Sequence, residues 1–94
     1  PLRVLAEIVA ECPQIPVMID SGVRRGTDVL KALALGAKFV FVGRPFNYAA
    51  ALAGEAGVRR AIQILSAELS IDMAMLGITS LDQLTPDYLR RADC

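Results

Sequence analysis

The sequence predicts a fold of the α/β class, because helical and strand patterns alternate along its 94 residues. Three apolar residues, Val17 to Ile19, follow a proline and indicate a strand that is buried on both faces, since no polar residue marks a solvent side. A second apolar run, Phe39 to Val42, ends like the first in a polar segment that contains glycine and arginine. One helical pattern separates the two runs, so we expect parallel, adjacent strands joined by a right-handed crossover.

The first helix is expected at the start of the chain. Its apolar residues fall on one helical face, and they are Leu2, Leu5, Ile8 and Val9. Pro13 lacks the backbone N–H that would continue the helical hydrogen bonds, so the helix ends before it. The first strand then occupies residues 16–20, from Pro16 to Asp20.

A second helix is expected over residues 28–35, with Thr27 as its cap. Asp28 lies in the first turn, where the helix dipole stabilises a carboxylate, and Gly36 follows the last turn. The sequence therefore contains both a start signal and a stop signal for this helix.

The C-terminal half is expected to be helical. Pro45 suits the first turn of a short helix that ends near Gly54. A longer helix ends at Gly77 and needs a sheet to cover its apolar stripe, which consists of Val58, Ile62, Leu65, Leu69, Met73 and Leu76. The last signals are a capping-box pair, Ser80 with Gln83, and a short turn that starts at Thr85 and Pro86 and runs through Leu89.

Two parallel strands do not make a stable sheet by themselves, and a complete eight-stranded barrel takes about 250 residues. The chain also opens on Pro1 in the middle of a helical pattern, so we expect it to come from something longer. Residues 1–94 are therefore predicted to be a single partial domain, the C-terminal fragment of a (β/α)8 TIM barrel. This fragment would contain the last two βα units and the C-terminal helices.

The charge balance gives no support to a nucleic-acid partner, because the numbers of basic and acidic residues are equal at ten each, whereas an excess of basic residues in a stripe is typical of such proteins. Cys12 and Cys94 lie near opposite ends without a metal-ligand spacing. We therefore expect no metal site, reduced thiols and a cytoplasmic protein. No stretch approaches the roughly 20 apolar residues of a membrane span, and the start of the chain indicates an amphipathic helix rather than a signal peptide.

Residues with phosphate-binding chemistry follow both strands, in the segments SGVRRG at 21–26 and GRP at 43–45. Glycine lets a ligand approach the backbone N–H groups, and the planar fork of arginine matches phosphate oxygens. Barrels of this class often bind phosphate at their last two βα loops and the start of a small extra helix. The carboxylate of Asp20 is placed to accept a hydrogen bond from a ribityl or ribose hydroxyl.

Each part of this pattern also has a purely structural explanation. Arg24 and Arg25 could form a solvated turn, Gly22 and Gly26 could be ordinary turn glycines, and Asp20 could cap the turn. The same pattern at two equivalent strand ends favours a phosphate site over these explanations. We expect Arg25 to be exposed to solvent.

The segments DSGVRRGTDVLKALALGAKFVFVGRP, YAAALAGEAGV and DMAMLGITSLDQLTPDYL resemble the C-terminal end of the FMN-dependent α-hydroxy acid dehydrogenase and oxidase family. That family includes L-lactate dehydrogenase, glycolate oxidase and mandelate dehydrogenase, and it binds FMN at the end of a (β/α)8 barrel. The resemblance implies that five consecutive residues hold the ribityl and phosphate groups of FMN, namely Asp20, Ser21, Gly22, Val23 and Arg24. It implies that Gly43 and Arg44 complete the phosphate site. Ser21 stands where many relatives have glycine.

The resemblance also implies the oxidation of an L-2-hydroxy acid to the 2-oxo acid, with L-lactate as the expected substrate. Family members use a histidine base, a carboxylate-binding arginine and a lysine near the flavin, all in segments that precede this one. This sequence contains no histidine, and loss of a general base removes a rate factor of roughly 10² to 10⁴. We therefore assign no catalytic residue and expect the chain alone to be inactive, although the complete enzyme would be cytoplasmic or at the inner face of the membrane.

Two alternatives remain. The chain could belong to a phosphate-binding barrel of different chemistry, similar to inosine monophosphate dehydrogenase or isopentenyl diphosphate isomerase. It could instead be an inactive module that associates with copies of itself, because unpaired strand edges and one-sided apolar helices favour homo-oligomers.

Overall fold

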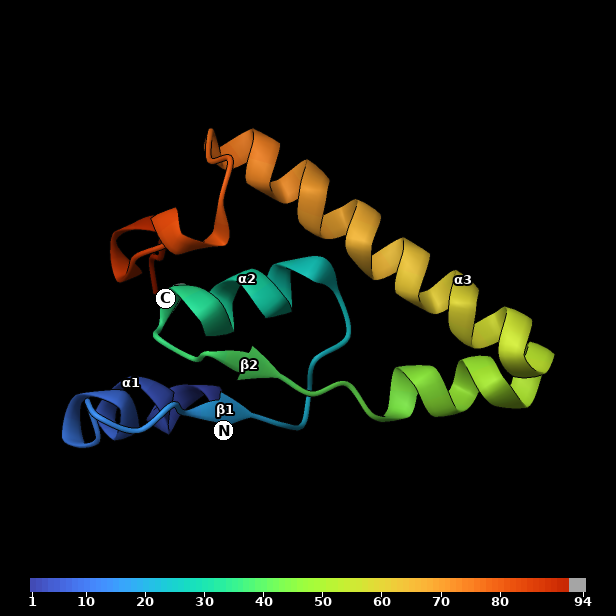
Figure 1. Ribbon diagram of the computed structural model, residues 1–94, viewed down its shortest axis with the longest axis horizontal. Coiled ribbons are helices and arrows are strands. Elements are labelled where there is room, and N and C mark those ends of the chain that lie inside the picture. The colour runs from blue at the N-terminus through green and yellow to red at the C-terminus, as the bar shows by residue number, and fades with distance from the viewer. Residues whose placement is uncertain (92–94) are drawn as a thin grey trace.

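The structure, a computed structural model, describes residues 1–91 and confirms the expected alternation of helices and strands (Figure 1). Its elements, in chain order, are α1 (Leu2–Glu11), β1 (Met18–Ile19), α2 (Gly26–Ala34), β2 (Phe39–Val40) and α3 (Arg44–Leu76), followed by two 3₁₀ turns at Leu81–Gln83 and Pro86–Tyr88. Cys12 is a free thiol, whereas Cys94 lies outside the described residues. No helix in the described part of the chain is long and apolar enough to cross a membrane.

The two strands pair in parallel, as predicted, with Met18 opposite Phe39 and Ile19 opposite Val40. Backbone hydrogen bonds from Lys38 N–H to the Val17 carbonyl (2.8 Å) and from Phe41 N–H to the Ile19 carbonyl (2.9 Å) extend this pairing. The strands are nevertheless shorter than the predicted ranges 16–20 and 39–42. Pairing stops on the β1 side because the chain turns at Ser21, whose φ is +86°.

The expectation that β1 is buried on both faces is wrong. Ile19 is 6% exposed and belongs to the core cluster, against which Val17 and Val40 pack, but Met18 is 56% exposed. On β2, Phe39, the pairing partner of Met18, is likewise exposed, at 55%. The reason is that helices cover one face of the pair, and no element within residues 1–91 covers the other face.

The core lies between the strand pair and its helices. Leu5 of α1, Ile19 of β1, Ala32 of α2 and Ala37 form one buried cluster. Small alanine side chains on the inner face of α2 let this helix approach the strands closely. The first helix ends at Glu11, before Pro13, as predicted.

Helix α2 begins at Gly26, two residues before the predicted start, and Arg25 rather than Thr27 occupies the cap position. The cause is Asp28, whose carboxylate accepts hydrogen bonds from the backbone N–H groups of Arg24 and Arg25, each at 3.0 Å. A carboxylate in the first turn that reaches back to these N–H groups satisfies donors that the helix leaves unpaired. Gly36 follows the end of the helix with a φ of +111°, as expected for a C-terminal glycine.

The predicted short and long helices are two arms of α3, which bends sharply between them (Figure 1). The break lies at Ala53 and Gly54, where the backbone is not helical and the φ of Gly54 is +58°. Glycine adopts this left-handed conformation without the steric cost that a Cβ imposes. The predicted end of the short helix near Gly54 is therefore confirmed as a bend.

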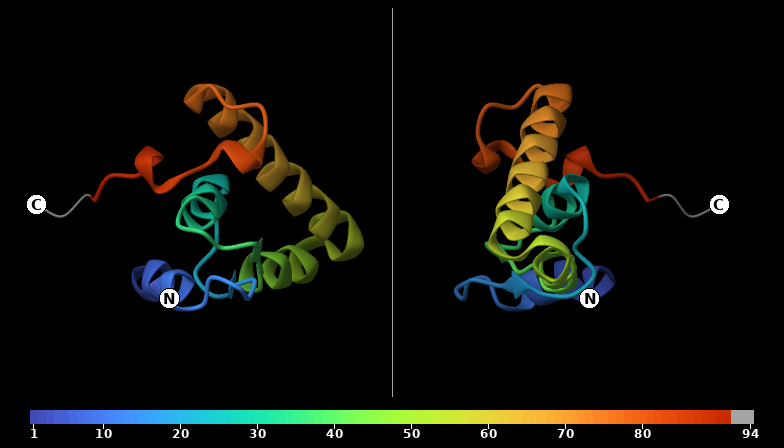
Figure 2. Two further views of the ribbon diagram at one scale, coloured as in Figure 1. Left: turned by 60° about the vertical axis from the view of Figure 1, so that its left-hand side comes forward. Right: turned by 90° about the vertical axis from the view of Figure 1, so that its right-hand side faces the viewer.

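The long arm of α3 packs on helix α2, and not on a sheet as the apolar stripe suggested (Figure 2). Within the stripe Leu65, Leu69 and Met73 are half-buried, whereas Ile62 is 49% exposed. Length explains the incomplete cover, because the nine residues of α2 extend about 14 Å and the long arm, 55–76, extends about 33 Å.

These two helices approach each other closely at Gly26, which is buried. A Cβ added to Gly26 would lie 2.7 Å from the Cβ of Glu68 and 2.8 Å from the backbone nitrogen of Leu69. These separations are below van der Waals contact, so only glycine fits at the first position of α2. Backbone therefore meets backbone where α3 crosses the start of α2.

The end of the chain follows the sequence signals. The side-chain oxygen of Gln83 accepts hydrogen bonds from the N–H groups of Thr79 (2.7 Å) and Ser80 (3.1 Å), and the Ser80 side chain accepts in return from the backbone of Gln83, which confirms the predicted capping box. The Ser80 hydroxyl accepts from the N–H of Asp82 at 3.3 Å. Pro86 begins the last turn, as predicted.

Replacement of Gly26 by alanine is expected to destabilise the chain by about 1–3 kcal/mol, because the added methyl group overlaps the backbone of α3. Urea unfolding followed by far-ultraviolet circular dichroism measures this change. Gly43→Ala is the matched control, since a Cβ there meets no atom within 4 Å, and its expected change is within about 0.5 kcal/mol. Equal effects of the two variants would contradict the close approach of α3.

Candidate functional site

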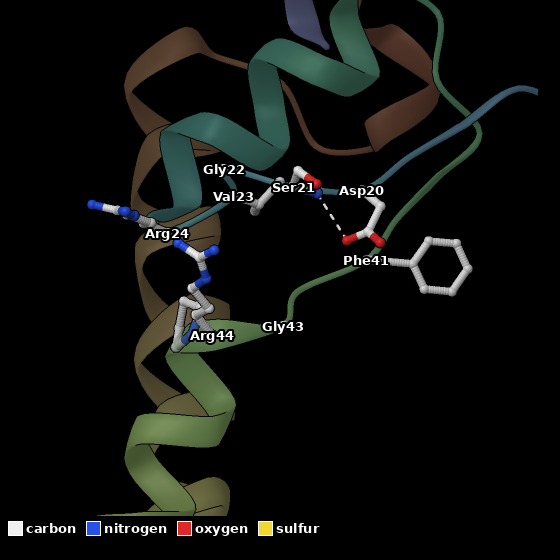
Figure 3. A pocket seen from close by; sticks show the side chains of 9 residues that line it. Asp20, Ser21, Gly22, Val23, Arg24, Phe41, Gly43 and Arg44 are labelled. Atoms are coloured by element: carbon white, nitrogen blue, oxygen red, sulfur yellow. Dashed lines mark hydrogen bonds between the residues drawn. The ribbon is translucent and has the colours of Figure 1, made fainter.

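A pocket of about 240 Å³ lies beyond the carboxyl ends of β1 and β2 (Figure 3). All of the residues that the sequence analysis assigned to a site line this pocket, and they are Asp20, Ser21, Gly22, Val23, Arg24, Gly43 and Arg44. Phe41 and Pro45 line it as well and were not assigned. Sites for whole ligands usually measure about 300–1,000 Å³, so a pocket of this size suits one end of a ligand.

The first wall of the pocket is the turn after β1. Ser21 and Gly22 have φ values of +86° and +79°, so two successive residues are in the left-handed region. Asp20 stabilises this turn, because its Oδ1 accepts a hydrogen bond from the N–H of Ser21 at 2.8 Å. The remaining oxygen of Asp20 has no protein partner in the described residues and can accept a hydrogen bond from a ligand hydroxyl.

Val23 anchors the turn, since its side chain is 7% exposed and lies beneath the pocket. A buried apolar side chain at this position holds the two flanking segments in place. The polar residues before and after Val23 can therefore face solvent while the loop keeps one conformation.

The second wall is the start of α3. Gly43 is the cap residue of this helix, with φ −108° and ψ −84°, and its carbonyl accepts hydrogen bonds from the N–H groups of Phe46 and Asn47 at 3.1 Å. A Cβ at Gly43, or at Gly22 on the opposite wall, would meet no atom within 4 Å. Both glycines therefore border open space, and a ligand can approach their backbone N–H groups.

The two arginines lie on the same side of the pocket in Figure 3, where the guanidinium group of Arg44 extends toward the segment that carries Arg24 and the side chain of Arg24 extends outward, away from Asp20. The carboxylate of Asp20 and the ring of Phe41 lie on the other side. Neither Arg24 nor Arg44 has an acidic partner among residues 1–91. The pocket thus has a cationic end for an anion and a carboxylate that can accept hydrogen bonds from hydroxyl groups.

The N-terminus of α2 does not contribute free backbone donors to the pocket. The N–H groups of Arg24 and Arg25 donate to Asp28, and the N–H of Gly26 donates to Oε1 of Glu68 at 2.9 Å. Carboxylates of the chain therefore already occupy the place where a bound anion would sit at this helix end. The donors left for a ligand are the two arginine side chains and the backbone of the glycine segments.

Arg25 is exposed, as predicted, with 72% of its side chain accessible, but it is also paired. Its Nε and Nη2 donate to Oε2 of Glu68 at 2.8 Å and 2.7 Å. The sequence analysis missed Glu68. The available signal was a carboxylate between the apolar residues Leu65 and Leu69, on the face of the long helix that should be covered.

This pair perturbs both groups. Hydrogen bonding and charge attraction from Glu68 raise the pKa of Arg25. The Arg25 guanidinium, and next the Gly26 N–H, hold the pKa of Glu68 below its ordinary value of 4.5. Glu68 is therefore ionised at neutral pH.

The donors and acceptors around the pocket suit a phosphate group attached to a polyol. Two guanidinium groups and glycine backbone N–H groups would bind the phosphate, and the free oxygen of Asp20 would accept from a hydroxyl. The apolar ring of Phe41, half exposed beside Asp20, borders the same space.

Comparisons with known proteins agree with this chemistry. Residues 1–91 match the model of a family described as FMN-dependent dehydrogenase. Glycolate oxidase 3 of Oryza sativa subsp. indica is 52% identical over 86 residues, which are 90% of this chain and 23% of that protein. L-lactate dehydrogenase (cytochrome) of Saccharomyces cerevisiae is 50% identical over an alignment of 95 positions, which covers 95% of this chain and 16% of that protein.

The fold is also similar to solved structures. A soluble mutant of the membrane-associated (S)-mandelate dehydrogenase from Pseudomonas putida superposes with a TM-score of 0.92 and 46% sequence identity, over 96% of this chain and 26% of that one. The chain therefore spans about a quarter, or less, of the length of these relatives.

Ser21→Gly is expected to stabilise the chain by about 0.5–1 kcal/mol. An L-residue in the left-handed region costs roughly 1–2 kcal/mol, and the greater freedom of unfolded glycine offsets about 0.4–1 kcal/mol of that gain. The urea unfolding midpoint measures the change. The control Ser66→Gly, at an exposed position inside α3, is expected to lower the midpoint because glycine weakens a helix interior. A lower midpoint for Ser21→Gly would show that the turn does not strain serine.

Proposed function

Because this chain belongs to the family of FMN-dependent dehydrogenases, we propose that it holds the phosphate and ribityl groups of FMN in a flavin-dependent oxidoreductase. The observation that carries the proposal is the pocket at the strand ends, where Arg24 and Arg44 lie opposite Asp20. The family match also favours flavin chemistry over the alternatives similar to inosine monophosphate dehydrogenase or isopentenyl diphosphate isomerase.

Each wall of the pocket has a role in this proposal. Arg24 and Arg44 bind the phosphate oxygens, and the backbone N–H groups of Gly22 and Gly43 complete the contacts. Asp20 accepts a hydrogen bond from a ribityl hydroxyl through the oxygen that Ser21 leaves free. FMN, when bound, supplies the ring system that accepts the electrons taken from the substrate.

We further propose that these residues form the closing two βα units and C-terminal helices of a (β/α)8 barrel. The parallel strands, the helices on one face and the exposed apolar residues Met18, Phe39 and Phe41 on the other face support this arrangement. In a barrel, helices cover the outside and side chains from other strands fill the inside. The length of the relatives leaves room for the remaining strands.

The proposed substrate of the complete enzyme is an L-2-hydroxy acid, with L-lactate as the specific choice. The names of the relatives support the class, because lactate, glycolate and mandelate are all 2-hydroxy acids. This chain contains no histidine, the residue that most often acts as a general base, so our proposal places the group that takes the proton from the substrate hydroxyl outside it. The 94 residues therefore contribute cofactor binding and no catalytic residue.

A second candidate is self-association without activity. The exposed apolar side chains of Met18, Phe39 and Phe41 favour it, since an uncovered strand pair can bind a second copy. Size-exclusion chromatography separates the two proposals, because a monomer that binds FMN excludes self-association as the main role.

Arg24→Ala and Arg44→Ala are each expected to weaken FMN binding by about 10- to 150-fold, the equivalent of one charge-assisted hydrogen bond. Riboflavin, which lacks the phosphate, should bind the wild-type chain and both variants with the same affinity. Quenching of flavin fluorescence measures both ligands. Arg59→Ala is the control, because Arg59 pairs with Glu55 on the exposed surface of α3. Equal losses for riboflavin and FMN would contradict a phosphate site.

Co-expression with the part of rice glycolate oxidase that precedes the matched segment is expected to restore flavin reduction by a 2-hydroxy acid. The chain alone should show none, because it lacks the base. Anaerobic loss of flavin absorbance after addition of L-lactate, glycolate or mandelate is the measurement. An assembled, FMN-loaded complex that none of the three substrates reduces would argue against this activity.

A further inference from the structure

Two arginines, Arg24 and Arg25, follow one another in the turn beside the pocket, and the guanidinium group of either one could bind an anion there. Arg24 lines the pocket, whereas Arg25 lines a separate depression with Thr27, Glu68 and Asp72. The backbone of Arg25 is extended, with φ −129° and ψ 163°, and successive side chains of an extended segment point to opposite sides. Something must hold this segment in the register that gives Arg24 to the pocket.

We propose that Glu68 is the positioning residue that commits Arg24, and not Arg25, to the bound phosphate. Both carboxylate oxygens of Glu68 accept hydrogen bonds from the two residues that follow Arg24. Oε2 accepts from Arg25 at 2.8 Å (Nε) and 2.7 Å (Nη2), and Oε1 accepts from the Gly26 N–H at 2.9 Å. The inference rests on the proposed function, since it concerns the phosphate of the same pocket.

The packing of α3 on α2 holds Glu68 in position. Its side chain is 23% exposed and lies on the face of α3 that packs on α2, next to the half-buried Leu69. Because Gly26 has no side chain, the backbone of α3 comes close enough for a short carboxylate contact with the start of α2. The contact therefore depends on how the helices pack, and it is kept by a carboxylate that stays ionised at neutral pH.

Asp28 completes the arrangement from within α2. Its Oδ2 accepts from the N–H groups of Arg24 and Arg25, each at 3.0 Å, so the backbone around both arginines is held. Asp28 holds the backbone of both arginines alike, and with Asp72 it adds a weaker charge attraction to the side chain of Arg25. Glu68 is the carboxylate that contacts the Arg25 guanidinium directly, and its effect on that group is the largest.

Without the charge of Glu68, Arg25 is free to turn toward an anion and to replace Arg24. The glutamine variant Glu68→Gln keeps the shape of the side chain and an oxygen for the Gly26 N–H, but it releases the guanidinium group. The choice between the arginines should then weaken while the fold remains.

The test measures the FMN affinity of the 94-residue chain and of Glu68→Gln, each with and without Arg24→Ala. In the wild-type background Arg24→Ala is expected to cost about 10- to 150-fold, and in the Glu68→Gln background less than about threefold, because Arg25 takes over. Glu55→Gln is the matched control, since Glu55 pairs with Arg59 in the same helix away from the pocket. Equal losses in both backgrounds would overturn the role of Glu68.

A second measurement needs no variant, so it tests the role of Glu68 even if Glu68→Gln does not fold. The Nε–H signals of Arg24 and Arg25 are followed by nuclear magnetic resonance in the isotope-labelled wild-type chain as FMN is added. The Arg24 signal should shift and the Arg25 signal should stay, and an equal or larger shift of Arg25 would overturn the inference.

If FMN and riboflavin bind equally well, or FMN does not bind, the proposed function fails and this inference fails with it. If FMN binds through its phosphate but Arg25 responds, only the inference fails.

Discussion

The parallel pairing of β1 with β2 is the constraint on which the site depends. Parallel strands end at the same edge, so the turn after Ile19 and the segment after Val40 must lie side by side. Each segment then contributes a glycine and an arginine to one pocket. An antiparallel pair would have placed Arg24 and Arg44 at opposite ends of the strands, and neither segment alone has the chemistry of a phosphate site.

Carboxylates decide which positive groups remain for a ligand. Asp28 and Glu68 bind the backbone N–H groups at the start of α2, and Glu68 also binds Arg25. Arg24 and Arg44 are left without an acidic partner in the described part of the chain. Two arginines that line one pocket without acidic partners leave positive charge there, so the arrangement favours a ligand that carries negative charge. The backbone of Ser21 lies in the left-handed region, which is strained for serine, and strained residues often lie at functional sites.

The open face of the strand pair has a physical consequence for the isolated chain. Helices α1 and α2 contribute to the core on one side, while Met18 and Phe39 remain more than half exposed on the other. Burial of such side chains is worth about 1.5–3 kcal/mol each, so much of the stability available to this sequence is not realised within these 94 residues. The same open face is what a barrel would fill with side chains from its other strands.

The sequence by itself determined the order of the elements, the parallel strands, the bend near Gly54 and seven of the nine residues that line the pocket. These features depend on local signals, such as proline and glycine positions and the apolar runs, which act over a few residues. Tertiary structure decided the open face of β1 and the packing of the long arm on α2 in place of a sheet. It also decided the role of Glu68, which contacts Gly26 across 42 residues of chain. Contacts between distant segments depend on how the helices pack, and no local pattern of residues encodes that distance.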